Sequence, residues 1–451
     1  MLDIPLQVTD SLIPILQALD HRSALGALLS SVDAAAYLRP LRMAQIQWLV
    51  NIAGGHYFLV FKGLHLALVV ACVALMVLAA QVRSRRDVAA LAFGLAVLTG
   101  MPTFLGTVWE AYPINHFLEM VVACLAVFVL AQRPAYWLGE LAALALFAAA
   151  ALTLESGLLV WVVLAVAWLT GMPGVPRRTV VAATALLGAY LVLRFGVLGT
   201  GLPTLIERST GFGLRTLDPP ELLARFGHWP LPLYAYNVLS ALGAVTLSQP
   251  RAGVWTLPAA LVAGQPVLGT AINIASSAIT TGVIVWCGAT RWTRWRARRF
   301  EPLDHTLLVA LALLVANAVL SYGYTKDEIL SPAGAFYALA AVAALRDGLA
   351  RLQPCLEAGA SGVRAVVLMA LVAVAAGGWG LRAIGLHYRC HQMALEVRNE
   401  WVDVDRWLER QHATPTTDEA RRLVSRLRQD ALDHATANPY FLALQGTVLF
   451  P

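Results

Sequence analysis

Long apolar segments alternate with short polar ones over most of this chain. The apolar runs lie at residues 64–81, 88–106, 114–131, 138–153, 156–170, 179–198, 269–289, 305–322, 332–346 and 364–381. Several approach the ~20 residues that cross a bilayer as a helix, and the two shortest are typical of paired helices joined by a bend. Two further apolar pieces within 231–268 either cross the membrane or lie on its surface. The pattern predicts an all-α polytopic membrane protein with about ten transmembrane helices, within a range of roughly 9–12.

Basic residues occupy alternate loops between these runs. One set of loops carries Arg83, Arg85, Arg86, Arg133, Arg177, Arg178, the run R-W-T-R-W-R-A-R-R at 291–299, Arg346, Arg351 and Arg364. The other set, at 107–113, 154–156 and 323–331, holds only Lys326. Because arginine-rich loops stay in the cytoplasm, the first set is expected inside. The run at 291–299 is expected to be a topology anchor in contact with anionic lipid.

This orientation predicts three parts of the chain. Residues 1–62 would form a first extracytoplasmic loop, with an amphipathic surface helix suggested by the weak periodicity of Ser11–Leu29. Residues 63–384 would form the transmembrane helical domain, with an extracytoplasmic loop at 199–231. Residues 385–451 would form a small extracytoplasmic helical segment, because apolar residues recur there every three or four positions: Met393, Val397, Trp401, Val404 and Leu408, then Leu423, Leu427 and Leu432.

Composition supports the membrane class. Of the 451 residues, 59% are hydrophobic and only 13% are charged, whereas soluble domains average about 25% charged residues. The net charge of +6 does not indicate nucleic acid binding, because the arginines lie in short clusters between apolar runs. Arginine far outnumbers lysine, which suggests a GC-rich bacterial genome. Together with the apolar runs, this predicts a protein of the bacterial inner membrane and cell envelope. The five cysteines have no C-x-x-C spacing, which argues against a zinc site or a disulfide framework.

Ionisable residues gather near the span ends on the predicted external side. They are Asp3, Asp10, Asp33, Arg39, Arg42, Glu110, His116, Glu155, Arg208, Arg215, His228, Lys326, Asp327 and Glu328. A cluster of both signs suits an anionic lipid-linked substrate, because Arg and Lys bind phosphate while carboxylates supply a base or hold a metal. A divalent metal therefore stays open as a cofactor, although the sequence has no paired carboxylates at a fixed short spacing.

Each candidate residue also has a purely structural interpretation. Asp3 and Asp10 would be solvated terminal residues, and Arg39 would snorkel to lipid headgroups. Glu155 would be favoured by the helix dipole at a helix N-terminus. Interfacial capping, packing or self-pairing at span ends would account for Glu110, His65, His116 and the Lys326–Glu328 turn.

Four motifs in the first 200 residues or so, in order along the chain, resemble those of GT-C glycosyltransferases, membrane enzymes related to protein O-mannosyltransferases. Y-L-R-P-L at 37–41 is similar to the Y-R-P-L segment of their first external loop. F-K-G-L-H at 61–65 is similar to the F-H-x-x-N-x-x-x-H opening of their next span. M-P-T-F-L-G-T-V-W-E at 101–110 occupies the place of their H-P-x-x-x-E-x-V loop, and T-L-E-S-G-L-L-V at 153–160 is similar to their S-K-E-S stretch.

The resemblance implies sugar transfer from a polyprenyl-phosphate donor to an acceptor on the external face. It also implies that an Asp in the first external loop acts as general base, a position that falls on Asp3 with Asp10 next. Glu110 and Glu155 complete the candidate catalytic set. Together with the external cluster, the motifs indicate substrate-binding roles for Asp33, Arg39, Arg42, His65, Tyr112, His116 and Lys326.

Two other function classes stay open. The family's first span, which precedes the position of Asp3, is expected to be missing from this chain, its second-loop acidic residue aligns near Gly106, and Leu154 stands in place of its lysine. These departures favour a non-catalytic scaffold that keeps the fold. The other alternative is a transporter or lipid flippase, which predicts inverted repeats that the sequence does not contain.

Overall fold

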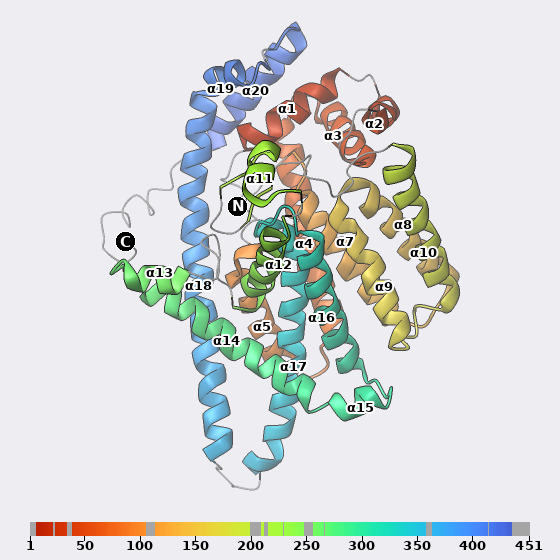
Figure 1. Ribbon diagram of the computed structural model, residues 1–451, viewed down its shortest axis with the longest axis vertical. Helices are drawn as coiled ribbons and strands as arrows, with labels where there is room; N and C mark the ends of the chain where they lie inside the picture. Colours follow the sequence, from red (N-terminus) through yellow and green to blue (C-terminus); the bar gives the residue numbers. More distant parts are fainter. Residues whose placement is uncertain are drawn as a thin grey trace. The chain divides into compact units, whose positions relative to one another are not determined.

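The computed structural model describes residues 6–434 except 21–22, 34–37, 105–112, 199–208, 212–214, 229, 248–255, 266, 358–362 and 414. Figure 1 labels its α-helices. The elements in chain order are α1 (Val8–Leu19), α2 (Ala24–Asp33), α3 (Pro40–Ala53), α4 (Tyr57–Ala80), α5 (Arg85–Gly100), α7 (His116–Ala131), α8 (Trp137–Thr153), the 3-10 helix η1 (Glu155–Leu158), α9 (Leu159–Leu169), α10 (Arg177–Leu191), the π-helix η2 (Val192–Val197), α11 (Pro219–Phe226), α12 (Leu231–Thr246), α13 (Thr256–Val262), α14 (Leu268–Ala289), α15 (Trp292–Arg296), α16 (Pro302–Leu320), the 3-10 helix η4 (Glu328–Leu330), α17 (Ser331–Glu357), α18 (Val363–Val402), α19 (Val404–Arg410) and α20 (Asp418–His434).

The fold is all-α. The described residues contain no strand, only two isolated β-bridges that join Ser209 to Leu217 and Thr210 to Tyr324. Each of the ten apolar runs coincides with a helix, and the two pieces within 231–268 are α12 and α13. The apolar runs of the sequence therefore correctly indicated helices at these positions.

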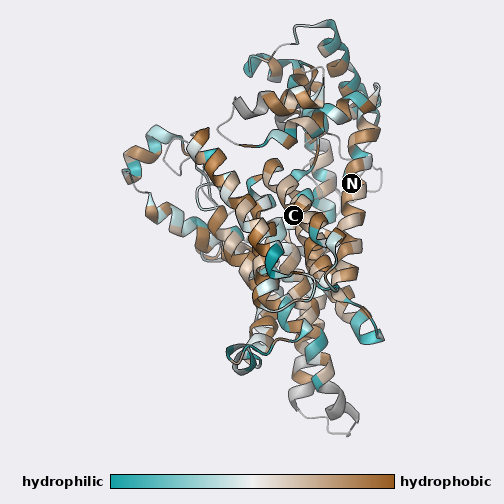
Figure 2. Ribbon diagram, turned by 90° about the vertical axis from the view of Figure 1, so that its right-hand side faces the viewer, coloured by the Kyte–Doolittle hydropathy of each residue, from teal (hydrophilic) through white to brown (hydrophobic). Residues whose placement is uncertain are grey.

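Among the residues that the structure describes, six helices are long and apolar enough to cross a bilayer. They are α4, α10 with η2, α14, α16, η4 with α17, and the Met369–Val402 part of α18. Hydrophobic residues cover the long helices, and hydrophilic residues gather near helix ends (Figure 2). These helices indicate a multi-pass membrane protein. The shorter apolar helices are α7, η1 with α9, α8 and α12.

The chain divides into two compact units. Unit 1 combines Met1–Val70, Thr107–His116 and Gly385–Pro451, and unit 2 combines Ala71–Gly106 with Phe117–Ile384. The polar ends of the sequence, which suggested two separate segments, thus belong to one unit. Helices α4 and α18 each contribute one part to unit 1 and the other part to unit 2.

Unit 1 is held by an apolar core drawn from both ends of the chain. Leu12 and Ile15 of α1 share this core with Trp401 at the end of α18, Leu408 of α19 and Leu423 of α20. The indole N–H of Trp401 donates to the carbonyl oxygen of Leu6 at 2.6 Å. Most of the predicted apolar positions lie in this core, although Ala431 rather than Leu432 is buried at the end of α20.

Helix α17 is the centre of unit 2. It packs against α5, α14 and α16, and α16 packs in turn against α9 and α12. The first part of α17, from Ala333 to Leu345, is buried throughout and consists largely of alanine. Small side chains let neighbouring helices approach closely, which is the usual way to pack helices in a membrane.

The closest of these approaches is at Gly94 on α5. A Cβ atom added there would lie 2.1 Å from Cγ2 of Val342 and 3.2 Å from the carbonyl oxygen of Ala338, both on α17. We therefore expect Gly94→Ala to lower the free energy of unfolding by about 1–3 kcal/mol through overpacking. Unfolding of the purified protein by sodium dodecyl sulfate measures this change.

Gly188 on α10 provides the matched control, because nothing lies within 4 Å of a Cβ added there. Gly188→Ala should leave the stability unchanged or raise it by up to about 1 kcal/mol, since alanine favours the helix. Adding Val342→Ala to the Gly94→Ala variant should restore much of the loss. Equal stability of the two single variants would contradict the packing of α5 on α17.

Candidate functional site

The arginine-rich loops of unit 2 lie together at one end of its helices. The contacts that bring them together are Gln132 Nε2 to Ala79 O at 3.0 Å, Arg346 Nη1 to Ala80 O at 3.0 Å, Gly174 N to Ala131 O at 2.9 Å and His305 Nε2 to Thr170 O at 3.2 Å. This end, called the arginine end below, therefore contains the loops that follow α4, α7, α9 and α14.

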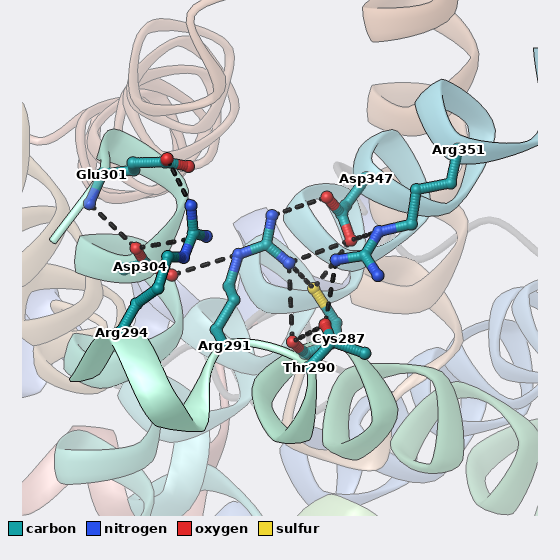
Figure 3. A network of polar contacts seen from close by, with 8 residues as sticks. All are labelled: Cys287, Thr290, Arg291, Arg294, Glu301, Asp304, Asp347 and Arg351. Atoms are coloured by element: carbon teal, nitrogen blue, oxygen red, sulfur yellow. Dashed lines mark hydrogen bonds and ion pairs between the residues drawn. The ribbon is translucent and has the colours of Figure 1, made fainter. Parts of the chain in front are cut away.

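A buried ion network ties three helices together at the arginine end (Figure 3). Arg291, between α14 and α15, is 5% exposed. Its two terminal nitrogens, Nη2 and Nη1, donate to the carboxylate of Asp347 on α17 at 2.5 and 2.9 Å. Its Nε also lies 3.1 Å from Oδ1 of Asp304, a fully buried residue of α16. Arg351 pairs with Asp347 at 2.8 Å, and Arg294 pairs with Glu301.

The network corrects the prediction that the run at 291–299 is a lipid anchor, at least for its first arginine. Arg291 points into the protein because it pairs there with two carboxylates, those of Asp304 and Asp347. Arg296, Arg298 and Arg299 are exposed. Three arginines face three carboxylates in the network, so its formal charge is zero. Such a self-compensated cluster is structural rather than ligand-binding, because it offers no unmatched charge to a substrate.

The opposite end of unit 2 contains two of the residues that the sequence singled out, Glu155 and Lys326. The His305–Thr170 contact joins the start of α16 to the end of α9, so these packed helices are antiparallel and η1 lies at the C-terminal end of α16. At that same end, the amide nitrogen of Asn317 donates to Ile329 O at 3.0 Å, which places η4 there too. We call this end, with η1, η4 and the last turn of α16, the polar end.

Glu155 begins η1, where the chain bends between α8 and α9. The bend is tight, because a Cβ atom on Gly157 would lie only 2.2 Å from the backbone of Ala150. Oε1 of Glu155 lies 3.5 Å from Nη1 of Arg194, and this nitrogen donates to the hydroxyl of Tyr190 at 3.0 Å. Arg194 is buried on the π-helix η2, an element that often occurs at functional sites.

Lys326 contributes a second pair of opposite charges at the polar end. Its Nζ lies 3.8 Å from Oε1 of Glu328 and 5.3 Å from the centre of the Tyr324 ring, and its side chain is about half exposed. The adjoining backbone is fixed by Asn237 of α12, whose amide nitrogen donates to Tyr322 O at 2.8 Å and Thr210 O at 3.1 Å. The polar end thus combines two carboxylates with two cations, of which Lys326 is the most exposed.

The remaining predicted residues belong to unit 1 or lie outside the described part of the chain. Asp3, Glu110 and Tyr112 are outside it, as are the side chains of Asp10 on α1 and Asp33 at the end of α2. Arg39 and Arg42, at the start of α3, are half-buried, and His65 of α4 and His116 of α7 are buried. Of the eleven candidates, Glu155 and Lys326 are the two that share one end of unit 2.

The sequence reasoning missed Arg382 of α18, a buried guanidinium at the end of an apolar run. It donates to Asn273 O, Ser276 Oγ and Ser277 Oγ of α14. A signal for it was present, because α14 carries polar residues at the helical spacing i, i+3, i+4, i+7 and i+8: Asn273, Ser276, Ser277, Thr280 and Thr281. Such a stripe in an apolar helix indicates a buried polar partner on a neighbouring helix.

Within the described ranges, no three His, Cys, Asp or Glu side chains converge in a way that could hold a metal ion. No family model, no curated protein and no solved structure matches this chain.

The ion network yields a stability prediction. Asp304→Asn leaves Arg291 with one fewer counter-charge in a buried site, so we expect a loss of about 3–5 kcal/mol in the free energy of unfolding. Glu301→Gln is the matched control, because Glu301 is more than half exposed and such pairs contribute at most about 1 kcal/mol. Unfolding in sodium dodecyl sulfate measures both, and similar losses in both variants would contradict a buried network.

Proposed function

We propose that the chain is an integral-membrane glycosyltransferase that moves a sugar from a polyprenyl-phosphate donor to an acceptor on the extracytoplasmic face. The observation that carries this proposal is the pair of Glu155 on η1 and Arg194 on η2. This pair lies at the polar end of unit 2, where Lys326 follows α16. The sugar and the polyprenyl chain in this proposal come from the motif resemblance. The supporting geometry is that carboxylates and two cations, Arg194 and Lys326, lie at the polar end of unit 2.

The chemistry follows from the charges. The acceptor hydroxyl attacks the anomeric carbon, the new C–O bond forms, and the bond from that carbon to the phosphate oxygen breaks. The electron pair leaves with the polyprenyl phosphate, and the hydroxyl proton passes to a carboxylate. Arg194 and Lys326 would offset the negative charge on the departing phosphate, because guanidinium and ammonium groups are strong phosphate ligands.

The four acidic candidates have different roles in this proposal. The resemblance gives the general base to Asp3, with Asp10 next, and Glu110 is the acidic residue of the second external loop. Glu155 is the one whose side chain is described, and its contact with Arg194 suits it to orient that cation. This contact favours a positioning role for Glu155 rather than the role of general base.

Transfer assays on the four acidic candidates test the proposal. The full-length protein in proteoliposomes is given a polyprenyl-phosphate-linked radioactive sugar, and transfer to lipid or protein acceptors is counted. Of Asp3→Asn, Asp10→Asn, Glu110→Gln and Glu155→Gln, the variant that lacks the general base should lose about 10²–10⁴-fold in rate. Glu221→Gln is the control, because this carboxylate pairs with Arg215 and Arg225 on the short helix α11 and should leave the rate unchanged.

Full activity in all four variants would overturn these roles. Binding of polyprenyl phosphate without turnover by the wild-type chain would favour the non-catalytic scaffold. Movement of the lipid across the liposome membrane without sugar chemistry would favour a flippase.

The orientation of unit 2 gives a separate test. We expect Lys326→Cys, at the polar end, to react with a membrane-impermeant maleimide added outside intact cells. Arg296→Cys, at the arginine end, should react only after the membrane is opened. The wild-type chain is the control for the native cysteines, of which Cys72, Cys124, Cys287 and Cys390 are buried. The reverse labelling pattern would put the polar end in the cytosol and exclude an external transferase.

A further inference from the structure

Arg382 differs from the other buried arginines of unit 2 in its lack of a counter-charge. It is 7% exposed, and its Cζ lies 3.8 Å from the centre of the Trp379 ring. Arg194 and Arg291 each have a carboxylate oxygen within 3.5 Å, whereas Arg382 pairs with no carboxylate among the described residues. A buried positive charge without a partner is costly, so its presence calls for an anion.

One edge of the Arg382 guanidinium is open to such an anion. Its three hydrogen bonds all come from Nη1, to Asn273 O at 3.1 Å, Ser276 Oγ at 3.0 Å and Ser277 Oγ at 2.8 Å. Nε and Nη2 make no hydrogen bond to the described residues, and neither nitrogen is sealed in the interior. These two nitrogens form the fork that binds two oxygens of a phosphate side by side.

The position of Arg382 along α18 places this fork at the depth of lipid headgroups. The uncharged segment 365–381 precedes it and begins just after Arg364. At 1.5 Å per residue this segment spans roughly 25 Å, close to the ~30 Å thickness of the hydrocarbon core. Arg382 therefore directly follows the uncharged segment, at a depth that the phosphate of a bilayer lipid can reach.

Exposed apolar side chains flank the buried Arg382 on α18 and occur at the start of α14. Its neighbours on α18, Leu381 and Ile384, are 56% and 58% exposed, and Leu268 at the start of α14 is 73% exposed. Exposed apolar side chains on a membrane helix contact acyl chains. A ligand of Arg382 that enters from the bilayer can thus bind its phosphate to the guanidinium and its chains to α14 and α18.

We propose that Arg382, oriented by Ser276 and Ser277 of α14, is a binding site for the phosphate of an anionic phospholipid of the bilayer. The net negative charge of such a lipid supplies the counter-charge that the protein does not. This assignment does not depend on the proposed sugar transfer.

Lipid binding to the delipidated full-length protein tests the assignment. Native mass spectrometry counts bound phosphatidylglycerol, with phosphatidylcholine as the zwitterionic comparison. We expect the wild type to retain phosphatidylglycerol preferentially and Arg382→Gln to bind it at least about tenfold more weakly, because a hydrogen bond to a charged group is worth about that factor. Arg382→Lys keeps the charge without the fork and should fall between them.

Thr281→Val is the matched control. Thr281 belongs to the same polar stripe of α14, but its hydroxyl contacts Thr246 O and the Tyr337 hydroxyl rather than Arg382. This variant should bind phosphatidylglycerol like the wild type. Ser277→Ala, which removes a contact that orients Nη1, should weaken binding and keeps the test open if Arg382→Gln fails to fold.

Three results would overturn the proposal. Equal retention of phosphatidylglycerol by Arg382→Gln and the wild type would show that Arg382 only links α14 to α18 by hydrogen bonds and binds no lipid. Equal thermal stabilisation of the wild type by inorganic phosphate alone would assign the site to a free anion. A preference for polyprenyl phosphate over phosphatidylglycerol that depends on Arg382 would instead assign the site to the donor of the proposed transferase. Transfer assays on the same variants would then show whether the site also affects sugar transfer.

Discussion

Charge compensation in an apolar surrounding is the constraint on which unit 2 depends. A guanidinium or carboxylate away from water costs several kcal/mol unless an opposite charge and hydrogen bonds meet it. At the arginine end the chain meets this requirement three times, with Arg291 between Asp304 and Asp347, Arg178 on Glu140, and Arg346 beside Asp87. Each pair joins two different helices, so the requirement also fixes which helix ends lie together.

The alanine-rich helix α17 makes this compensation possible. Asp347 and Arg346 reach neighbours on both sides of α17 because α5, α14 and α16 all pack closely against it. The close contact at Gly94 and the ion pair of Asp87, both on α5, therefore depend on one another. Helix packing and electrostatics are two consequences of the same small side chains, since a bulkier α17 would move the charges apart.

The sequence was sufficient for the helices but not for their partners. Every apolar run became a helix, because hydrophobic length and periodicity are local properties. The burial of Arg291 was not predicted, because its carboxylates come from α16 and α17 and no local pattern links them. The joint core of α1 with α19 and α20 was missed for the same reason. Arg382 was within reach of prediction, since the stripe on α14 is periodic.

The location of the candidate site follows from where buried charges are fully paired within the protein and where charged side chains stay partly exposed. The cluster around Arg291 closes on itself with equal numbers of both signs, so it holds the fold and has nothing to offer a ligand. At the polar end, Glu155 pairs with Arg194 and Lys326 pairs with Glu328. Glu155 and Lys326 stay partly exposed, so the proposed substrate would have access to them. Arg382 completes the series, since hydrogen bonds orient its side chain and no carboxylate among the described residues pairs with it. Our proposal takes its anion from the bilayer, which is the nearest source at the end of an apolar run.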